Sequence, residues 1–238
     1  MNLPILMFHK VAEMPAGARH PGNYVSPALF DEVLGALRAW GYVSVTIEQW
    51  LAWCEGRGTL PERPVVITFD DGYRSNRDVA WPILKRHGFS ATVFLVSDFL
   101  GRTNAWDADE IQEPLLTADD VRVLHGEGMA FGSHTKTHAA LTQLDRDTAL
   151  VELRSSREAL EAILGEPVRI LCYPYGKQNA EVREVAREAG YAAGVRGRGR
   201  LNGRGQNPLE LRRIKLDNGR SARWLRWELF RLRWLMFG

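Results

Sequence analysis

The sequence predicts an α/β fold, specifically a distorted (β/α) barrel of about seven parallel strands. Apolar strand-like runs alternate with amphipathic helix-like runs along most of the chain, and this alternation is typical of a parallel sheet. The seven or eight strand-like runs favour closure into a barrel over an open sheet. With 238 residues, of which 45% are hydrophobic, the chain suits one large domain with a substantial core.

The expected strands are short apolar runs separated by helical or polar segments. In chain order they are Leu3–Phe8, Val43–Val45, Val65–Phe69, Ala91–Val96, Met129–Phe131, Arg169–Tyr173, Tyr191–Val195 and Leu211–Leu216. Helices are expected between most of them, and local signals mark several helix ends.

These local signals are capping residues and glycines. Ser26 followed by Pro27 predicts an N-cap with proline in the first turn, and Gly41 predicts a helix end. Thr46 and Gln49 have the spacing of a capping box. Three more glycines are expected to close helices, namely Gly88, Gly165 and Gly190.

Composition narrows the functional classes. The formal net charge of +2 is too small to indicate a nucleic-acid-binding protein, and no glycine-rich phosphate-binding fingerprint follows an expected strand. Cys54 and Cys172 are interpreted as reduced core thiols. The sequence shows neither a signal peptide nor an apolar run that could span a bilayer, so we expect a cytoplasmic location, or a peripheral one at the inner membrane face.

Two adjacent carboxylates carry most of the functional information. Asp70 and Asp71 follow the apolar run Val65–Phe69, and Gly72 allows the chain to turn away sharply. Neighbouring negative charges repel each other, and this repulsion lowers stability unless the two carboxylates have separate roles. A cation held by one aspartate would separate these roles, and it would leave the other aspartate free to act as a base.

A histidine pair is the candidate second half of such a metal site. His134 and His138 are four residues apart, about one helical turn, so both imidazoles could face one ion if His134 begins a turn. Two nitrogens and one carboxylate oxygen, with a position left for water, form the pattern of catalytic zinc. Such a set also accepts cobalt, manganese or iron. The alternative is that both histidines are solvated loop residues.

Three segments together resemble the motifs of the polysaccharide deacetylase family, also called the NodB-homology domain. They are Thr68-Phe69-Asp70-Asp71-Gly72, His134-Thr135-Lys136-Thr137-His138 and Tyr173-Pro174-Tyr175-Gly176. The resemblance runs from about Leu3 to Leu216. It implies a distorted (β/α) barrel and metal-dependent hydrolysis of an acetyl group, usually from N-acetylated sugars.

The resemblance also implies roles for these residues. Asp71, His134 and His138 would hold a divalent metal, and Asp70 would be the general base. The backbone N–H of Tyr175 would help to stabilise the oxyanion.

The sequence departs from the family pattern at two places. Cys172 stands where the third motif usually carries the arginine that orients the base, and Arg213 is a candidate replacement. The late Leu-x-His motif that supplies the acid is absent, because no histidine follows His138. His9, at the end of the first expected strand, resembles the corresponding histidine of biofilm-polysaccharide deacetylases and is our candidate acid. The alternative for His9 is a buried histidine with satisfied hydrogen bonds.

Three further residues are candidates for contacts with the sugar. Tyr73 and Trp106 could stack on a pyranose ring, although Trp106 could equally pack within its own loop. Pro174 belongs to the third motif. His20 is interpreted as part of a polar loop outside the site.

Residues 221–238 differ in composition from the barrel, which is assigned to residues 1–220. Arginines and tryptophans interleave there with leucines, and the spacing predicts an amphipathic helix with Leu225, Leu229, Leu232 and Met236 on one face. That face would pack on the barrel. The opposite face would either lie at a membrane surface or cover the barrel locally, with its arginines extended into solvent.

The sequence therefore predicts an enzyme that uses a divalent metal, with zinc favoured, to remove an acetyl group from an N-acetylated sugar of a polysaccharide or lipid-linked glycan. An O-acetyl esterase on acetylated polysaccharide would use the same site. A saccharide-binding protein without turnover would fit the departure at Cys172 and the missing late histidine. It would not need the intact set of Asp70, Asp71, His134 and His138.

Overall fold

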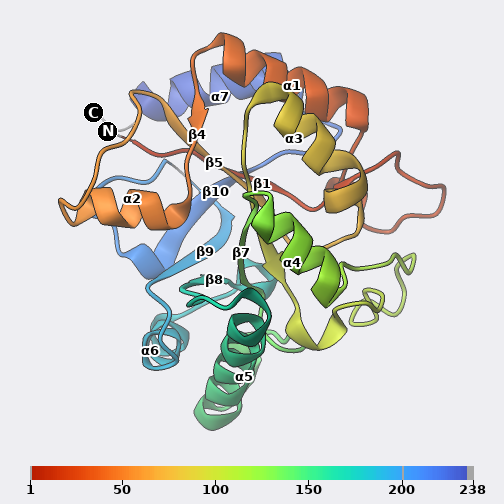
Figure 1. The fold of residues 1–238 in the computed structure, drawn as a ribbon, viewed down its shortest axis with the longest axis vertical. Helices are drawn as coiled ribbons and strands as arrows, with labels where there is room; N and C mark the ends of the chain where they lie inside the picture. Colours follow the sequence, from red (N-terminus) through yellow and green to blue (C-terminus); the bar gives the residue numbers. More distant parts are fainter. Residues whose placement is uncertain (1, 200, 235–238) are drawn as a thin grey trace.

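Seven parallel strands close into a barrel at the centre of the molecule (Figure 1). The computed structural model describes residues 2–199 and 201–234. Around the ring the order is β1-β10-β9-β8-β7-β6-β5, and the pairing of β5 with β1 closes it. Strand β4 pairs with β5 outside the ring. The register shifts between β9 and β10, so the barrel is distorted. The predicted fold class is confirmed.

All the expected strands are present, with ends that differ by a few residues. They are β1 (Ile5–Phe8), β4 (Val43–Ser44), β5 (Pro64–Phe69), β6 (Thr92–Leu95), β7 (Ala130–Ser133), β8 (Ile170–Cys172), β9 (Ala193–Arg198) and β10 (Leu211–Lys215). The sequence did not predict a small pair of parallel strands after β1, formed by β2 (Lys10–Val11) and β3 (Tyr24–Val25).

Helices cover the outside of the barrel. They are α1 (Pro27–Ala39), α2 (Ile47–Cys54), α3 (Trp81–His87), α4 (Ala118–Gly126), α5 (Arg146–Leu164), α6 (Ala180–Glu188) and α7 (Ala222–Trp234). The predicted caps are confirmed: Ser26 caps α1, and Thr46 forms a capping box with Gln49 on α2. Gly88 and Gly165 end α3 and α5 with left-handed backbones.

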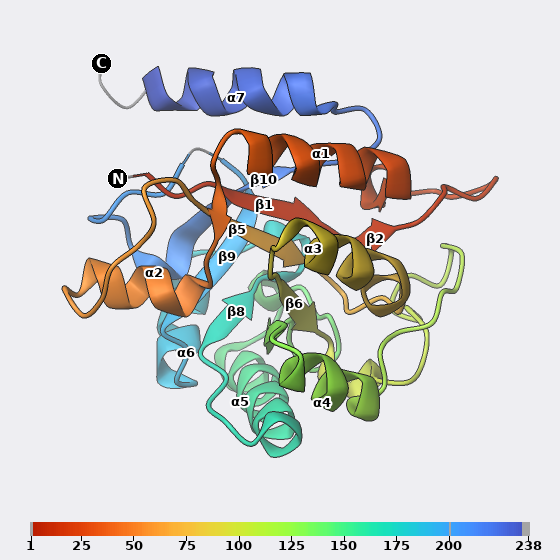
Figure 2. The same cartoon turned by 45° about the horizontal axis from the view of Figure 1, so that its top comes forward.

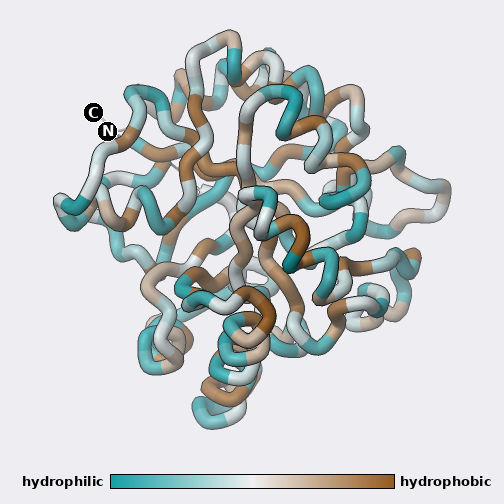
Figure 3. The backbone as a smooth tube through the Cα atoms, viewed as in Figure 1, coloured by the Kyte–Doolittle hydropathy of each residue, from teal (hydrophilic) through white to brown (hydrophobic). Residues whose placement is uncertain are grey.

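Alternate residues of each strand point into the barrel. The inward residues near the strand starts form one apolar cluster, which includes Ile5, Val66, Phe94, Ile170 and Leu211. Their outward neighbours, such as Leu6, Ile67 and Leu171, pack against the surrounding helices. Helix α2 closes the amino end, because its buried Trp50 joins the interior cluster. Figure 3 shows the hydrophobic residues concentrated along the central strands. The same two-residue period makes the polar residues at the carboxyl ends point inward as well.

Helix α7 forms the outermost layer over α1 (Figure 2). Leu225, Leu229 and Leu232 are buried in the core that α1 shares, so the predicted apolar face does pack on the barrel. Residues 235–238 of the expected helix, including Met236, lie outside the described residues. In the described part of the chain, every helix is too short or too polar to cross a bilayer.

Gly132 on β7 is closely surrounded by other residues of the barrel, and this close packing generates a prediction. A Cβ there would lie 2.6 Å from the Phe94 ring and 2.9 Å from the Ile170 carbonyl oxygen. We expect Gly132→Ala to lower the unfolding free energy by roughly 1–3 kcal/mol in urea unfolding. Gly126→Ala is the matched control, because nothing lies within 4 Å of a Cβ at the end of α4. Equal stability of the two variants would contradict this packing.

Candidate metal centre and active site

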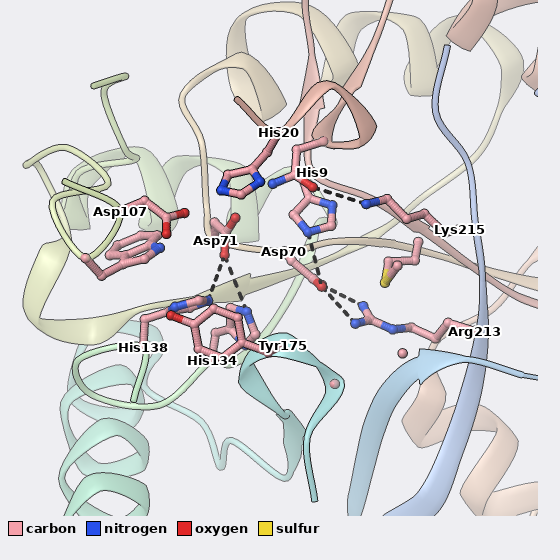
Figure 4. A pocket seen from close by; sticks show the side chains of 15 residues that line it. His9, His20, Asp70, Asp71, Asp107, His134, His138, Tyr175, Arg213 and Lys215 are labelled. Atoms are coloured by element: carbon pink, nitrogen blue, oxygen red, sulfur yellow. Dashed lines mark hydrogen bonds and ion pairs between the residues drawn. The ribbon is translucent and has the colours of Figure 1, made fainter. Parts of the chain in front are cut away.

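Polar residues from four strands meet at the carboxyl end of the barrel (Figure 4). His9 follows β1, and the Asp70–Asp71 pair follows β5. His134 follows β7, and Arg213 lies on β10. Together they line a cavity of about 370 Å³. Barrel closure therefore brings together the motifs that the sequence placed at separate strand ends.

Asp71, His134 and His138 form a tight, buried cluster. Oδ1 of Asp71 lies 3.4 Å from Nε2 of His134 and 3.4 Å from Nε2 of His138. Their side chains are only 3–7% exposed, and the three ligand atoms lie within 4.8 Å of one another. Two imidazole nitrogens and one carboxylate oxygen that converge in this way can hold a divalent ion and leave positions open for other ligands.

The contacts around these side chains fit a resident metal. Nδ1 of His134 lies 2.8 Å from the carbonyl oxygen of Cys172, so an Nδ1 proton donates there and Nε2 presents its lone pair toward Asp71. The 3.4 Å separations between Nε2 and Oδ1 exceed an ordinary N–H···O hydrogen bond. An ion between these atoms would draw all three toward itself.

A second set of potential ligands is Asp70, His134 and Cys172, whose ligand atoms also lie within 4.8 Å of one another. The Arg213 guanidinium already bridges two of them. Its Nη2 donates to Oδ2 of Asp70 at 2.8 Å and to Sγ of Cys172 at 3.2 Å. Because a fixed cation fills that space, the set that includes Asp71 is the better candidate for a metal.

Backbone strain is concentrated in the same place. Among the described residues, Asp71, Thr135, His138 and Tyr175 are the non-glycine residues with positive φ, between 60° and 73°. Each such residue costs on the order of 1–3 kcal/mol. The suggestion that His134 begins a helical turn was wrong. The segment is an irregular loop, and the left-handed residues Thr135 and His138 are what turn the second imidazole back toward Asp71.

Glu152 on α5 stabilises this loop. Its Oε2 accepts the backbone N–H groups of Lys136 at 3.1 Å and Thr137 at 3.0 Å, and its Oε1 accepts the Thr137 hydroxyl at 2.8 Å. Ser133 Oγ accepts the backbone N–H of Thr135 at 3.2 Å. These bonds offset part of the strain. The sequence contained no local signal for Glu152, because it acts from a helix that follows the motif.

Asp70 is held by Arg213 through two parallel hydrogen bonds. Nη1 donates to Oδ1 at 2.6 Å and Nη2 donates to Oδ2 at 2.8 Å, and Arg213 is only 1% exposed. Nε2 of His9 lies 3.9 Å from Oδ2 of Asp70. The candidate base, the candidate acid and the candidate orienting arginine are thus brought together.

The environment shifts the pKa values of these groups in predictable directions. Burial alone would raise the pKa of Asp70, but the charge and hydrogen bonds of Arg213 outweigh it and hold the pKa at about 2. Burial likewise tends to raise the pKa of Asp71, but His134 and His138 hold it well below its usual range. Burial lowers the pKa of His9 to about 4, although Asp70 and Asp71 oppose this shift. His9 is therefore neutral at pH 7 in the free protein.

Two aromatic side chains form a wall of the cavity beside the metal cluster. The Trp106 ring stacks on the imidazole of His138, with centroids 4.8 Å apart and planes inclined by 24°. Tyr175, which is 56% exposed, packs edge-on against the same imidazole at 4.8 Å. Trp106 therefore lines the cavity and packs within the site at once.

Four polar side chains that line the cavity were missed by the sequence reasoning, namely those of His20, Asn23, Asp107 and Lys215. Lys215 follows Arg213 with the strand period of two, so that period could have identified it. The loop that carries His20 had no such pattern. Buried Glu110 ties this loop to the Trp106 segment, since its carboxylate accepts the backbone N–H of His20 at 2.8 Å.

Tyr73 and Pro174 are not among the residues that line the cavity, and their contact with the sugar stays a prediction. Gly72, with φ of 75°, turns the chain so that Tyr73 is buried at 2% exposure, and Nζ of Lys10 lies 4.4 Å from its ring centroid. Pro174 is buried at the start of the turn that exposes Tyr175.

The Asp70–Arg213 pair generates a pH-dependent prediction. The folded pKa of Asp70, about 2, lies below the value of about 3.9 for an unfolded aspartate. The pair therefore stabilises the fold above about pH 4, and this stabilisation is lost as the pH falls toward 2. Arg213→Leu leaves a buried carboxylate without its cation. We expect a loss of about 3–5 kcal/mol in unfolding free energy at pH 7, and a smaller loss in acid, where Asp70 takes up a proton.

Urea unfolding of the native protein and the variant across this pH range measures the difference. Arg212→Leu is the matched control, because Arg212 is the neighbouring, partly exposed residue of β10. It should change stability by no more than about 0.5 kcal/mol. A loss in Arg213→Leu that stays constant with pH would show that the ion pair is not its cause.

Comparisons with known proteins identify relatives of this chain. The family model "Polysaccharide deacetylase" matches residues 57–194, more than half of the chain. The Bacillus subtilis protein named "Putative polysaccharide deacetylase YxkH" is 28% identical over 223 residues, which cover 93% of this chain and 74% of the relative. The poly-β-1,6-N-acetyl-D-glucosamine N-deacetylase of Staphylococcus aureus is 25% identical over 182 residues, or 72% of this chain. The chain spans only 61% of the length of that enzyme.

Solved structures show the same fold. The Streptococcus pyogenes deacetylase PplD in complex with acetate has a TM-score of 0.84 at 26% identity, covering 96% of this chain and 98% of that one. IcaB from Ammonifex degensii has a TM-score of 0.82 at 23% identity, covering 96% and 97%. The resemblance stated from the sequence motifs is confirmed, and the chain belongs to the polysaccharide deacetylase family, whose members are hydrolases that deacetylate polysaccharides.

Proposed function

We propose that this protein is a metal-dependent hydrolase that removes the acetyl group from an N-acetylated sugar of a polysaccharide or lipid-linked glycan. The proposal rests on one observation, which is that a single cavity contains both a potential metal site and a separate carboxylate. Asp71 and two imidazoles can hold a cation, while Asp70 is kept as a separate carboxylate by Arg213. The N-acetyl assignment is supported by the Staphylococcus aureus relative, which is an N-deacetylase.

Asp71, His134 and His138 would hold the metal, and their nitrogen and carboxylate donors favour zinc while also accepting cobalt, manganese or iron. When bound, the ion supplies Lewis-acid polarisation of the acetyl carbonyl and activation of the attacking water. Tyr175 lines the same cavity and has a left-handed backbone, and its N–H group would stabilise the developing oxyanion.

Asp70 would accept the proton that the attacking water loses. Arg213 donates a hydrogen bond to each carboxylate oxygen of Asp70, which orients the carboxylate and keeps it ionised. A carboxylate held at a pKa of about 2 binds that proton only weakly and passes it on readily. This suits a group that must be ionised again before the next turnover.

His9 is the group that would receive that proton. It is neutral in the resting protein, and its Nε2 lies 3.9 Å from Oδ2 of Asp70. The protonated imidazole would then donate to the leaving amine as the bond between the amide carbon and nitrogen breaks. Water adds across that bond overall, and the products are acetate and the free amino sugar. The proton is thus delivered without the late histidine that this chain lacks.

The proposal predicts metal-dependent release of acetate. Purified protein should release acetate from a β-1,6-linked N-acetylglucosamine oligomer or a chitooligosaccharide, lose this activity on chelation, and regain it with zinc. Asp71→Asn should lose both metal and activity, because it removes the charged ligand shared by the two imidazoles. If acetate is released from acetylated xylan and not from the N-acetylated sugars, the protein is an O-acetyl esterase instead. Saccharide binding by the metal-loaded protein with no acetate from either sugar class would identify a binding protein.

The role of His9 has its own test. His9→Ala should leave the metal content unchanged, because His9 contacts Asp70 and is not a ligand, while turnover falls by about 10²–10⁴-fold. His20→Ala is the matched control, since His20 lines the same cavity without an ion-pair contact to Asp70 in the described structure. Near-normal turnover of His9→Ala would remove His9 from the mechanism.

A further inference from the structure

The outer face of α7 carries a stripe of exposed basic and aromatic side chains. Arg223, Arg226, Trp227 and Phe230 are exposed, and their spacing of three and four residues places them on one side of the helix. Trp227 is 57% exposed and Phe230 is 61% exposed. The opposite side is the leucine face buried over α1. The helix is therefore divided into a face that packs on the barrel and a basic, aromatic face toward solvent.

The positive charge of this stripe is not neutralised within the described part of the helix. The segment Ala222–Leu232 contains three arginines and one acid, Glu228. Both carboxylate oxygens of Glu228 accept hydrogen bonds from Arg231, at 2.6 and 2.8 Å. The charges of Arg223 and Arg226 therefore remain available to an external anion.

A groove extends the stripe toward α1. It has a volume of about 410 Å³, and its lining includes Trp40, Tyr42, Leu229 and Phe230 along with the cations Arg63 and Arg226. An apolar floor beside two guanidinium groups suits an amphipathic ligand that has an anionic head and apolar chains.

We propose that the α7 stripe binds the surface of a membrane that contains anionic lipids. Arginines would contact lipid phosphates, while the rings of Trp227 and Phe230 enter the interface at headgroup depth. Each contribution alone is weak, and together they reinforce each other because charge brings the helix to the surface and the aromatic side chains hold it there.

A second copy of the chain is a poorer occupant of this face. A twofold interface would place the same patch of both copies in contact, so the positively charged surface formed by Arg223 and Arg226 would meet the same positive surface of the other copy. Like charges in a buried contact are unfavourable. An anionic surface instead complements the charge and also accepts the exposed rings.

The stripe lies on the flank of the barrel. Helix α7 begins at Ala222, shortly after β10, and the stripe continues toward the amino ends of the strands, where Arg226 and Phe230 share a groove with Arg63, the residue before β5. The binding itself does not depend on the deacetylase activity, so the two proposals can fail separately.

The experiment is co-sedimentation of the full chain with vesicles. The native protein should bind vesicles of phosphatidylglycerol mixed with phosphatidylcholine, bind pure phosphatidylcholine far more weakly, and dissociate as salt is raised. Arg223→Gln combined with Arg226→Gln should weaken partitioning to the anionic vesicles by roughly 30-fold, from a contribution near fivefold for each arginine. Trp227→Ser combined with Phe230→Ser should also release the protein, since those side chains enter the interface.

Matched controls lie on helices at the other side of the barrel. Arg122→Gln with Arg154→Gln removes two exposed arginines from α4 and α5, and Val123→Ser with Val151→Ser removes two exposed apolar side chains from the same helices. These variants should bind vesicles as the native protein does. Unchanged circular dichroism and acetate release from a soluble oligosaccharide would show that every variant is folded.

Three results would overturn the proposal. The native protein would stay in the supernatant with anionic vesicles, or the control variants would weaken binding as much as the α7 variants do. In the third, the native protein would be a dimer in lipid-free solution, and Trp227→Ser combined with Phe230→Ser would dissociate this dimer. That result would assign the stripe to contact between two copies.

Discussion

The site depends on one geometric constraint, the return of two imidazoles to a carboxylate at the end of another strand. Closure of the barrel brings the end of β7 close to the end of β5, but it does not by itself aim the side chains. The side chains are oriented by the left-handed backbone conformation of Asp71, Thr135 and His138. Residues other than glycine rarely adopt this conformation. Glu152 and the surrounding core stabilise the loop that carries this strain. The strained backbone thus lowers the stability of the fold and brings three potential metal ligands close together, as is common at functional sites.

The arginine beside the candidate base, Asp70, shows how a barrel can supply one group from different strands. The family motif places an arginine at the position of Cys172, and here the guanidinium comes from Arg213 on β10. Inward-facing side chains of all strands share one interior, so a long side chain from another strand can reach Asp70. Cys172 then becomes a small neighbour whose sulfur accepts a bond from that same guanidinium. The source of the positive charge is therefore a different strand, and the charge still lies against both oxygens of the candidate base Asp70.

The fold was predictable from the sequence because its signals are local. Alternating apolar runs and helix caps such as Ser26 and Thr46 depend on neighbouring residues, and they gave the barrel, its helices and the strand ends where motifs meet. Side-chain directions were less predictable. Tyr73 follows a glycine with positive φ, and it is buried and is not among the residues that line the cavity. The same limit applied to His20, whose place at the cavity depends on a hydrogen bond between two loops far apart in the chain.

The claim on which the proposed activity rests is that Asp71, His134 and His138 share one divalent ion. Anomalous diffraction at the zinc absorption edge, from crystals of zinc-loaded protein, tests it most directly. We expect one strong peak in the cavity, about 2.0–2.2 Å from an Asp71 carboxylate oxygen and from Nε2 of each histidine. A peak held by Asp70, His134 and Cys172, or full zinc loading without a peak among the three proposed ligands, would contradict the account.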